Sequence, residues 1–243
     1  MQTNLIEIFS SFQGEGPHVG EPMAFLRFQD CALSCGFCDT PASFERHSQF
    51  RVEAPPQSGQ FRFFPNPVDG ALLGELLKPY SGQILSITGG EPLQQADFLA
   101  AWLPSLRWDS PVLLETNGVL PAALAKVIDR VDIVSMDIKL PSVTGMRPYW
   151  KEHAEFLRIA RAKRVYVKVV VSNPTDLGEL KQAIAIVEAE APGVPFILQP
   201  VTPAGTVRER IPEERLKELY RFSKQHLEDV RVIPQIHPIL GLL

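Results

Sequence analysis

Three cysteines, Cys31, Cys35 and Cys38, are the only cysteines in this chain of 243 residues. An odd number in one short segment is a poor framework for disulfides but a good set of metal ligands. Thiolates favour iron–sulfur clusters, zinc or copper(I) over hard cations. Three protein ligands would leave one iron of a four-iron cluster open to another molecule. The alternatives are a zinc ion completed by a distant histidine and three buried cysteines without a metal.

Alternating strands and helices are expected to position the cysteine segment, because short β-branched runs alternate with longer amphipathic segments along the chain. The predicted strands are Met23–Phe28, Ile84–Thr88, Val112–Glu115, Ile133–Met136, Val165–Val171 and Phe196–Gln199. The predicted helices are Asp69–Lys78, Ala96–Leu106, Pro121–Ile128, Trp150–Ala160, Leu177–Ala189 and Pro212–Gln225. Repeated βα units predict a mostly parallel sheet, and six are too few for a closed eight-fold barrel. We therefore expect a partial, open (βα)6-type TIM barrel with ligands at the carboxyl ends of its strands.

Residues 41–67 interrupt this alternation with a stretch rich in proline, glycine and polar residues. We predict an insertion loop there, with a short hairpin at Phe61–Phe64. Nothing else suggests a boundary, and the length suits one domain over residues 1–243.

Charge and hydropathy indicate which classes of binding partner the protein has. Lysine and arginine total 24 against 28 acidic residues, a net charge of -4 that gives no general attraction to nucleic acid or anionic membranes. The chain starts without a secretory signal pattern and has no run of apolar residues long enough to span a bilayer. We expect a cytoplasmic enzyme that acts on a small molecule.

Polar motifs occur where the predicted strands end. They are Thr88-Gly89-Gly90-Glu91-Pro92, Glu115-Thr116-Asn117-Gly118, Ser135-Met136-Asp137-Ile138-Lys139 and Gln199-Pro200. Glycine permits close backbone approach, and Glu91 could accept a hydrogen bond from an ammonium group. The alternatives are a plain turn at Gly90, an internal ion pair between Asp137 and Lys139, and a terminating turn after Gln199.

The C-x3-C-x2-C array after a first βα strand resembles the radical S-adenosylmethionine (SAM) superfamily. This resemblance implies a [4Fe–4S] cluster on Cys31, Cys35 and Cys38, with SAM on the open iron and electron transfer that cleaves SAM to a 5′-deoxyadenosyl radical. No catalytic residue is then required beyond the cluster and SAM, and the protein supplies position and shielding. By the same resemblance, the residues that contact SAM are Phe37, Gly90, Glu91, Ser135, Asp137, Lys139 and Gln199.

A glycine-punctuated loop, Phe12-Gln13-Gly14-Glu15-Gly16-Pro17, carries an amide and a carboxylate ahead of the cysteines. This loop, Cys38-Asp39-Thr40 and the C-terminal Pro234-Gln235-Ile236-His237 resemble the 7-carboxy-7-deazaguanine synthase family. That family contracts the ring of 6-carboxy-5,6,7,8-tetrahydropterin and releases ammonia, in the biosynthesis of queuosine and related deazapurines. The resemblance implies substrate contacts from Phe12, Gln13, Gly14, Glu15, Arg27, Thr88 and His237.

Three of these assignments have plain structural alternatives. Arg27, expected on the substrate carboxylate, could instead pair with Asp30. His237 could cap a terminal strand. Thr40, which the resemblance places on a Mg2+ ion near the substrate, could form only a turn.

The resemblance also implies an electron donor such as flavodoxin or ferredoxin, and a homodimer. The main alternative is a glycyl-radical activating enzyme, which shares the cysteine array but acts on a protein. The Gln13-Gly14-Glu15-Gly16 loop and His237 argue against that alternative.

Overall fold

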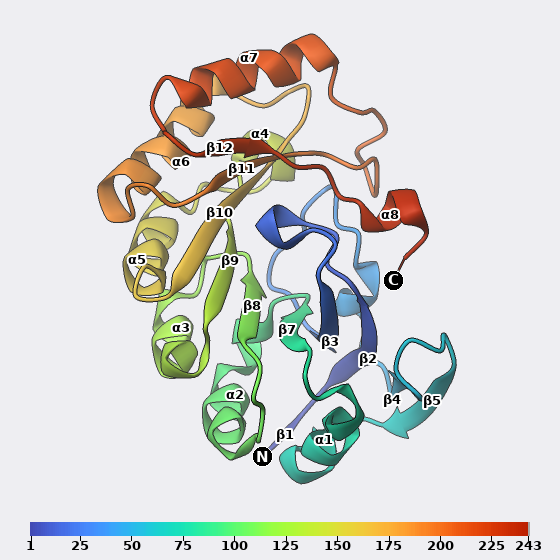
Figure 1. Ribbon diagram of the computed structural model, residues 1–243. Helices are drawn as coiled ribbons and strands as arrows, with labels where there is room; N and C mark the ends of the chain where they lie inside the picture. The colour runs from blue at the N-terminus through green and yellow to red at the C-terminus, as the bar shows by residue number, and fades with distance from the viewer. Residues whose placement is uncertain (243) are drawn as a thin grey trace.

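Seven parallel strands form the main part of a ten-stranded sheet in the computed structural model, which describes residues 1–242 (Figure 1). They lie in the order β12-β11-β10-β9-β8-β7-β3. Their bounds are β3 Pro22–Phe28, β7 Ile84–Gly89, β8 Val112–Thr116, β9 Ile133–Asp137, β10 Arg164–Val171, β11 Phe196–Pro200 and β12 Val230–Val232. All six predicted strands are present, and β12 is an additional short edge strand. The expected open, partial barrel is confirmed, because the strand order does not close on itself.

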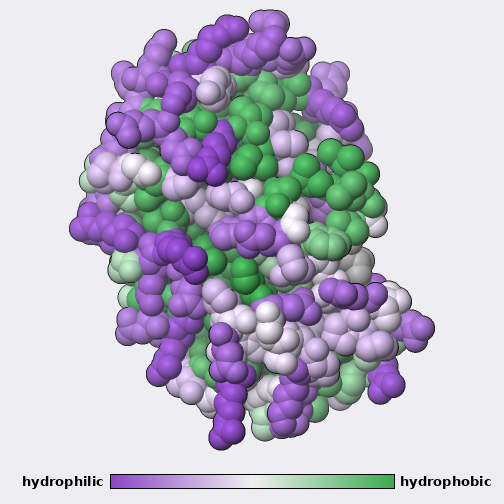
Figure 2. All heavy atoms as spheres, in the orientation of Figure 1, coloured by the Kyte–Doolittle hydropathy of each residue, from purple (hydrophilic) through white to green (hydrophobic). Residues whose placement is uncertain are grey.

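Helices follow the parallel strands and cover the outer side of the sheet, where Figure 1 shows α2, α3, α5 and α6 in a row. The helices are α1 Gly70–Leu77, α2 Ala96–Trp102, α3 Pro121–Val127, α4 Pro141–Thr144, α5 Trp150–Ala160, α6 Leu177–Glu190, α7 Glu213–Lys224 and α8 His237–Leu240. Asp69 and Asp176 begin α1 and α6 by accepting hydrogen bonds from the backbone N–H groups of Leu72 and Glu179. The final helix, α8, carries the exposed Ile239 and Leu240, and Figure 2 shows a hydrophobic area at this position.

The remaining strands correct the prediction of an insertion loop. Strand β2 (Leu5–Phe12) runs antiparallel to β3, β4 (Gln49–Glu53) runs parallel to β2, and β5 (Phe61–Pro65) runs antiparallel to β4. The predicted hairpin is therefore larger than expected and extends the main sheet. The alternation in Gln49-Phe50-Arg51-Val52-Glu53 was the signal for β4, because Phe50 and Val52 are buried. A separate small sheet pairs β1 (Gln2–Thr3) with β6 (Val68–Asp69).

The inner face of the sheet changes from apolar to polar along each strand. A buried cluster fills the beginning of the inner face and consists of Phe9, Met23, Phe25, Leu113, Ile133, Tyr166 and Ile197. Two residues further on, the same face carries Arg27, Glu115, Ser135, Lys168 and Gln199. The carboxyl ends of the strands therefore hold polar side chains above an apolar floor.

No helix among residues 1–242 combines the length and the apolar character needed to cross a bilayer.

Candidate active site

A cavity of about 670 Å³ opens at the carboxyl ends of the parallel strands. It is lined by the loop after β2, the loop after β3, the ends of β7 to β11 and the segment before α8. Residues more than 200 positions apart in the sequence, such as Gln13 and His237, therefore face the same space. Ligand sites of α/β barrels occupy this end of the fold.

Cys31, Cys35 and Cys38 all line this cavity, on the loop that follows β3. The Gly36 N–H donates to the Thr144 carbonyl oxygen at 3.3 Å, and the Gly36 carbonyl oxygen accepts from the Thr206 N–H at 2.8 Å. A Cβ atom at Gly36 would lie 2.7 Å from the Thr206 hydroxyl oxygen, so any larger residue would require the Thr206 side chain to move. The cysteine loop is thus held from two sides.

The chemistry of the three thiols fits an iron–sulfur cluster. Burial raises the pKa of the Cys31 thiol to about 11 and also raises the pKa values of Cys35 and Cys38, so the thiols are protonated at neutral pH without a metal. Bound iron would stabilise the thiolates that burial disfavours. Within residues 1–242, no three His, Cys, Asp or Glu side chains, these cysteines included, are grouped closely enough to hold one metal ion. The support for a cluster is therefore the chemistry of the three thiols and their position on one loop in the cavity lining.

Three buried polar atoms in the cavity lining have no hydrogen-bond partner among residues 1–242, which fits a polar cofactor such as SAM. They are Asn117 Nδ2, Asp137 Oδ1 and Gln199 Oε1. Buried polar groups normally have a hydrogen-bond partner, so these atoms indicate where a ligand supplies one. Asp137 and Gln199 were expected from the sequence, whereas Asn117 appeared only inside a strand-end motif.

Gly90 and Glu91, both expected to contact SAM, lie in different surroundings. Gly90 lines the cavity, and a Cβ atom there would lie 2.3 Å from the Asp30 carbonyl oxygen. Glu91 is 1% exposed and does not line the cavity. Its carboxylate accepts hydrogen bonds from the Thr116 hydroxyl at 2.9 Å and from the N–H groups of Asn117 and Leu93 at 2.8 and 3.0 Å. The side chain of Glu91 therefore fixes the end of β8, and its expected contact with SAM stays a prediction.

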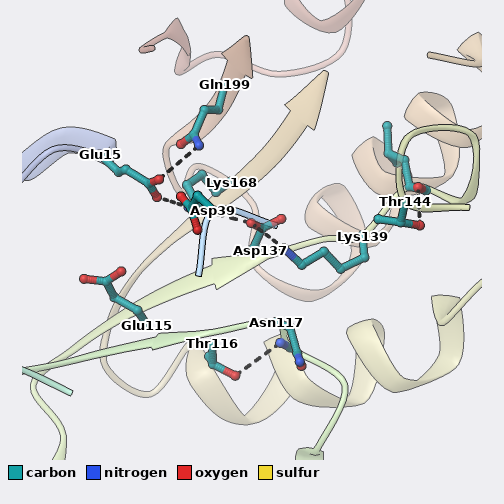
Figure 3. A network of polar contacts seen from close by, with 12 residues as sticks. Glu15, Asp39, Glu115, Thr116, Asn117, Asp137, Lys139, Thr144, Lys168 and Gln199 are labelled. Atoms are coloured by element: carbon teal, nitrogen blue, oxygen red, sulfur yellow. Dashed lines mark hydrogen bonds and ion pairs between the residues drawn. The ribbon is translucent and has the colours of Figure 1, made fainter. Parts of the chain in front are cut away.

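Asp137 and Lys139 form the ion pair that was considered as their structural alternative, and they also line the cavity. Lys139 Nζ donates to Asp137 Oδ2 at 2.8 Å (Figure 3). It also lies 5.4 Å from the centre of the Phe37 ring. Burial acts to lower the pKa of Lys139, but the adjacent Asp137 outweighs it and the pKa is raised. Asp137 keeps one oxygen free for a ligand. Phe37 and Ser135 also line the cavity, as expected.

The loop before β3 places Glu15 at the centre of a buried polar network. Lys168 forms an ion pair with the Glu15 carboxylate, which also accepts from the side-chain amide of Gln199 at 3.2 Å (Figure 3). The side-chain amide of Gln235 donates to the same carboxylate at 2.6 Å. Burial acts to raise the pKa of Glu15, but Lys168 and then Gln235 outweigh it and lower the pKa to about 2. Lys168 and Gln235 were missed as site residues.

The other expected substrate residues also line the cavity. They are Phe12, Gln13, Gly14, Arg27, Thr88 and His237. Gln13 Nε2 donates to Glu115 Oε1 at 3.0 Å, and the Thr88 hydroxyl donates to Glu115 Oε2 at 3.4 Å. Glu115 therefore belongs to the site, although the sequence suggested only its motif.

Arg27 and His237 adopt positions that differ from their structural alternatives. Arg27 Nε donates to Glu7 Oε1 at 2.8 Å, so its ionic partner is Glu7 and not Asp30. His237 begins the short helix α8 and packs against Gly14, where a Cβ atom would lie 2.3 Å from His237 Nδ1. The Ile236 N–H donates to the Gly14 carbonyl oxygen at 2.9 Å, which joins the C-terminal segment to the substrate loop.

Thr40 lines the cavity next to the cysteines and also takes part in a turn. Its hydroxyl donates to Asp39 Oδ1 at 3.1 Å, while its carbonyl oxygen accepts from the Ser43 hydroxyl at 2.7 Å. Thr40 therefore forms part of a turn and also lines the cavity. Two acceptor oxygens, those of Asp39 and Thr40, lie close to each other beside the cysteine loop.

Fold and site together define a radical SAM enzyme, and residues 26–179 match the model of the radical SAM superfamily. Over 98% of its length the chain is 42% identical to 7-carboxy-7-deazaguanine synthase from Geobacter sulfurreducens, with 97% of that protein covered. It is 32% identical to 7-carboxy-7-deazaguanine synthase from Methanothermobacter thermautotrophicus over 100% of this chain and 98% of that one. The chain belongs to the 7-carboxy-7-deazaguanine synthase family within this superfamily.

Solved structures support the fold. QueE from Escherichia coli has a TM-score of 0.57 at 15% identity, with 96% of this chain and 94% of that chain covered. A domain of pyruvate-formate lyase-activating enzyme from Bacteroides vulgatus has a TM-score of 0.51 at 13% identity, with 62% of this chain and 99% of that one covered. The match to the second structure concerns the shared core only, and the relatives matched over nearly the whole chain do not favour the activating-enzyme alternative.

Proposed function

We propose that the protein converts 6-carboxy-5,6,7,8-tetrahydropterin to 7-carboxy-7-deazaguanine with loss of ammonia, as a radical SAM carbon–nitrogen lyase of queuosine and deazapurine biosynthesis. One observation carries this proposal. The cysteines, the strand ends with unpartnered polar atoms and the Phe12–Glu15 segment line a single cavity. A cofactor and a small planar substrate can therefore meet inside it.

Cys31, Cys35 and Cys38 would hold a [4Fe–4S] cluster, with the open iron directed to SAM. Cluster and SAM together supply the radical that starts the rearrangement. The chain's own residues hold SAM in place: the Gly90 backbone, Ser135, Asp137, Lys139, Gln199 and Phe37, with Asn117 added by the structure. Glu91 is proposed to contact SAM as well, and its carboxylate also fixes the backbone of Asn117.

The substrate would bind against Gln13, Glu15, Thr88, Glu115 and His237. The N–H groups on the aminopyrimidinone edge of a pterin need acceptors, and the carboxylates of Glu15 and Glu115 supply them. Lys168 keeps Glu15 ionised, and this geometry is set before the substrate arrives. Preset acceptors orient the reacting ring without reorganisation at each turnover.

A Mg2+ ion would bind between Thr40 and the substrate, where Asp39 can add an oxygen or hold a bound water. Hard cations prefer such oxygen ligands, and Mg2+ usually retains several waters.

The hairpin β4–β5 joins the main sheet, which supports one radical SAM domain over residues 1–243. Family resemblance supports a flavodoxin- or ferredoxin-type electron donor, a homodimer and a cytoplasmic location. Sedimentation of the purified protein tests the homodimer, and reduction of the cluster by each donor tests the electron partner.

The activity is tested by anaerobic incubation of reconstituted protein with dithionite, SAM, Mg2+ and the carboxypterin. Formation of 7-carboxy-7-deazaguanine, detected by mass, is expected. SAM cleavage without this product, together with modification of a glycyl-radical enzyme, would support the activating-enzyme alternative instead.

A further inference from the structure

A row of side chains crosses five neighbouring strands and reaches the hairpin. Arg27 on β3 is in register with Thr88 on β7 and with Glu7 on β2, Glu7 is in register with Arg51 on β4, and Arg51 is in register with Phe63 on β5. Residues at matching positions of neighbouring strands point to the same face. All five line the cavity. The hairpin formed by β4 and β5 is therefore a wall of the site.

Glu7 is shared by two arginines. Its Oε1 accepts from Arg27 Nε at 2.8 Å, while its Oε2 accepts from Arg51 Nε and Nη2 at 2.8 and 2.6 Å. Aromatic rings support both guanidinium groups, because Arg51 lies 4.3 Å from the centre of the Phe61 ring and Arg27 lies 5.5 Å from that of Phe9.

Glu7, Arg27 and Arg51 form a triad whose charges do not cancel. Two cations face one anion, and the Glu7 side chain is 8% exposed against 19% for Arg27 and 37% for Arg51. Within residues 1–242, the Nη atoms of Arg27 have no hydrogen-bond partner. A net positive charge with a free guanidinium edge therefore faces the cavity, and this is the geometry that binds a carboxylate.

We infer that Arg51 is a specificity-determining residue for the substrate carboxylate, because it neutralises Glu7 and leaves the charge of Arg27 available to the ligand. Without Arg51, Glu7 and Arg27 form a pair with no net charge, which gives little electrostatic attraction for a carboxylate. This inference rests on the proposed function and gives the β4–β5 hairpin a role in selecting the substrate.

Charge balance predicts an unusual rescue. Arg51→Met should weaken the binding of 6-carboxypterin, a fluorescent analogue of the substrate, by about 10- to 100-fold, the usual range for losing a charge-assisted contact. Binding of pterin, which lacks the carboxylate, should change little. The double variant Glu7→Gln/Arg51→Met removes one anion and one cation, so it should recover most of the affinity for 6-carboxypterin.

Fluorescence titration of both ligands tests this, with Arg62→Met as the matched control. Arg62 lies on the same hairpin and is exposed, and it does not line the cavity, so its loss changes the net charge equally without touching the triad. Arg27→Ala provides the reference for complete loss of carboxylate binding. In turnover assays, Arg51→Met should raise the KM for the carboxypterin more than it lowers kcat.

Equal affinity of wild type and Arg51→Met for 6-carboxypterin would overturn the inference, as would the same loss of affinity in Arg62→Met. A double variant as weak as Arg51→Met, with an unchanged unfolding midpoint, would also overturn it. These results differ from a failure of the proposed function, in which the wild type itself would bind both pterins equally and form no deazapurine.

Discussion

Glu15 and Lys168 form a buried ion pair between residues 153 positions apart, and Lys168 Nζ also lies 3.6 Å from Asp137 Oδ2. Lys168 thus connects the loop proposed to bind substrate with the strand end proposed to bind SAM. Because the Lys168 cation lies between the carboxylates of Glu15 and Asp137, it fixes the distance between the proposed substrate-binding and SAM-binding parts of the cavity.

Loss of that cation should be costly. Lys168→Met leaves the buried Glu15 carboxylate without a cation, while Asp137 keeps its ion pair with Lys139. Breaking a buried pair from one side typically costs about 3–5 kcal/mol of unfolding free energy. Urea unfolding of the cluster-free protein measures this. The double variant Glu15→Gln/Lys168→Met should recover part of the loss, and additive effects would show that the two residues do not interact.

Cys35→Ala should abolish both cluster binding and product formation, because no other cysteine in the chain can replace the lost thiolate. Iron and sulfide content, the visible absorption of the cluster and 5′-deoxyadenosine formation after anaerobic reconstitution are the measurements. Ser34→Ala, in the same loop, is the matched control and should retain all three. SAM cleavage by Cys35→Ala at the wild-type rate would refute the cluster assignment.

Turnover should depend on Mg2+, and Thr40→Ala should weaken that dependence. Thr40 lies two residues after Cys38, so a bound ion would hold the substrate close to the cluster, where a displacement near 1 Å can lower the rate about a hundredfold. Thr40→Ser keeps the hydroxyl and should retain most activity. The assay is a Mg2+ titration of chelator-treated enzyme. If wild type and Thr40→Ala respond alike, Thr40 is only a turn residue.

His153 should make the folded state less stable in mild acid. It is fully buried, its Nε2–H donates to the Asn117 carbonyl oxygen at 3.2 Å, and burial lowers its pKa to about 4. Between pH 6.5 and pH 4 the unfolded chain binds a proton that the folded protein does not, so stability falls as the pH falls, by up to about 3 kcal/mol.

The pKa of Glu91 is raised by burial to about 6, which has the opposite effect in this range, so a single curve is ambiguous. The informative quantity is the difference in unfolding free energy between wild type and His153→Gln, measured in urea from pH 7.5 to pH 5. The wild type should lose stability relative to the variant as the pH falls. A constant difference would mean that His153 binds its proton equally in the folded and unfolded states, so that folding does not lower its pKa.

Much of the site could be predicted because chemistry and strand period agree. Residues two positions beyond the apolar floor, such as Arg27 after Phe25 and Gln199 after Ile197, face the cavity as the strand alternation requires. Lys168 obeys the same rule after Tyr166, but within the apolar run Val165–Val171 it looked like an interruption of a buried strand.

Other features depend on tertiary contacts that no local pattern contains. Glu91 stands in a recognisable motif, yet its carboxylate binds the backbone of the neighbouring strand end. Arg51 lies in a segment whose proline and glycine content predicted a loop, and only pairing of β4 with β2 brings it to Glu7. Gln235 likewise reaches Glu15 because the C-terminal segment folds back onto the Gly14 backbone.

The two backbone hydrogen bonds of Gly36 affect how readily a cluster can be rebuilt after exposure to oxygen. Their partners are Thr144 and Thr206, outside the cysteine loop, and neither bond involves a thiol, so loss of a cluster would remove no atom of either bond. An empty loop that keeps its shape has little conformational entropy to lose when iron and sulfide return. Oxygen-damaged protein is therefore expected to be repairable by reloading in its folded form, provided that its cysteines are still reduced.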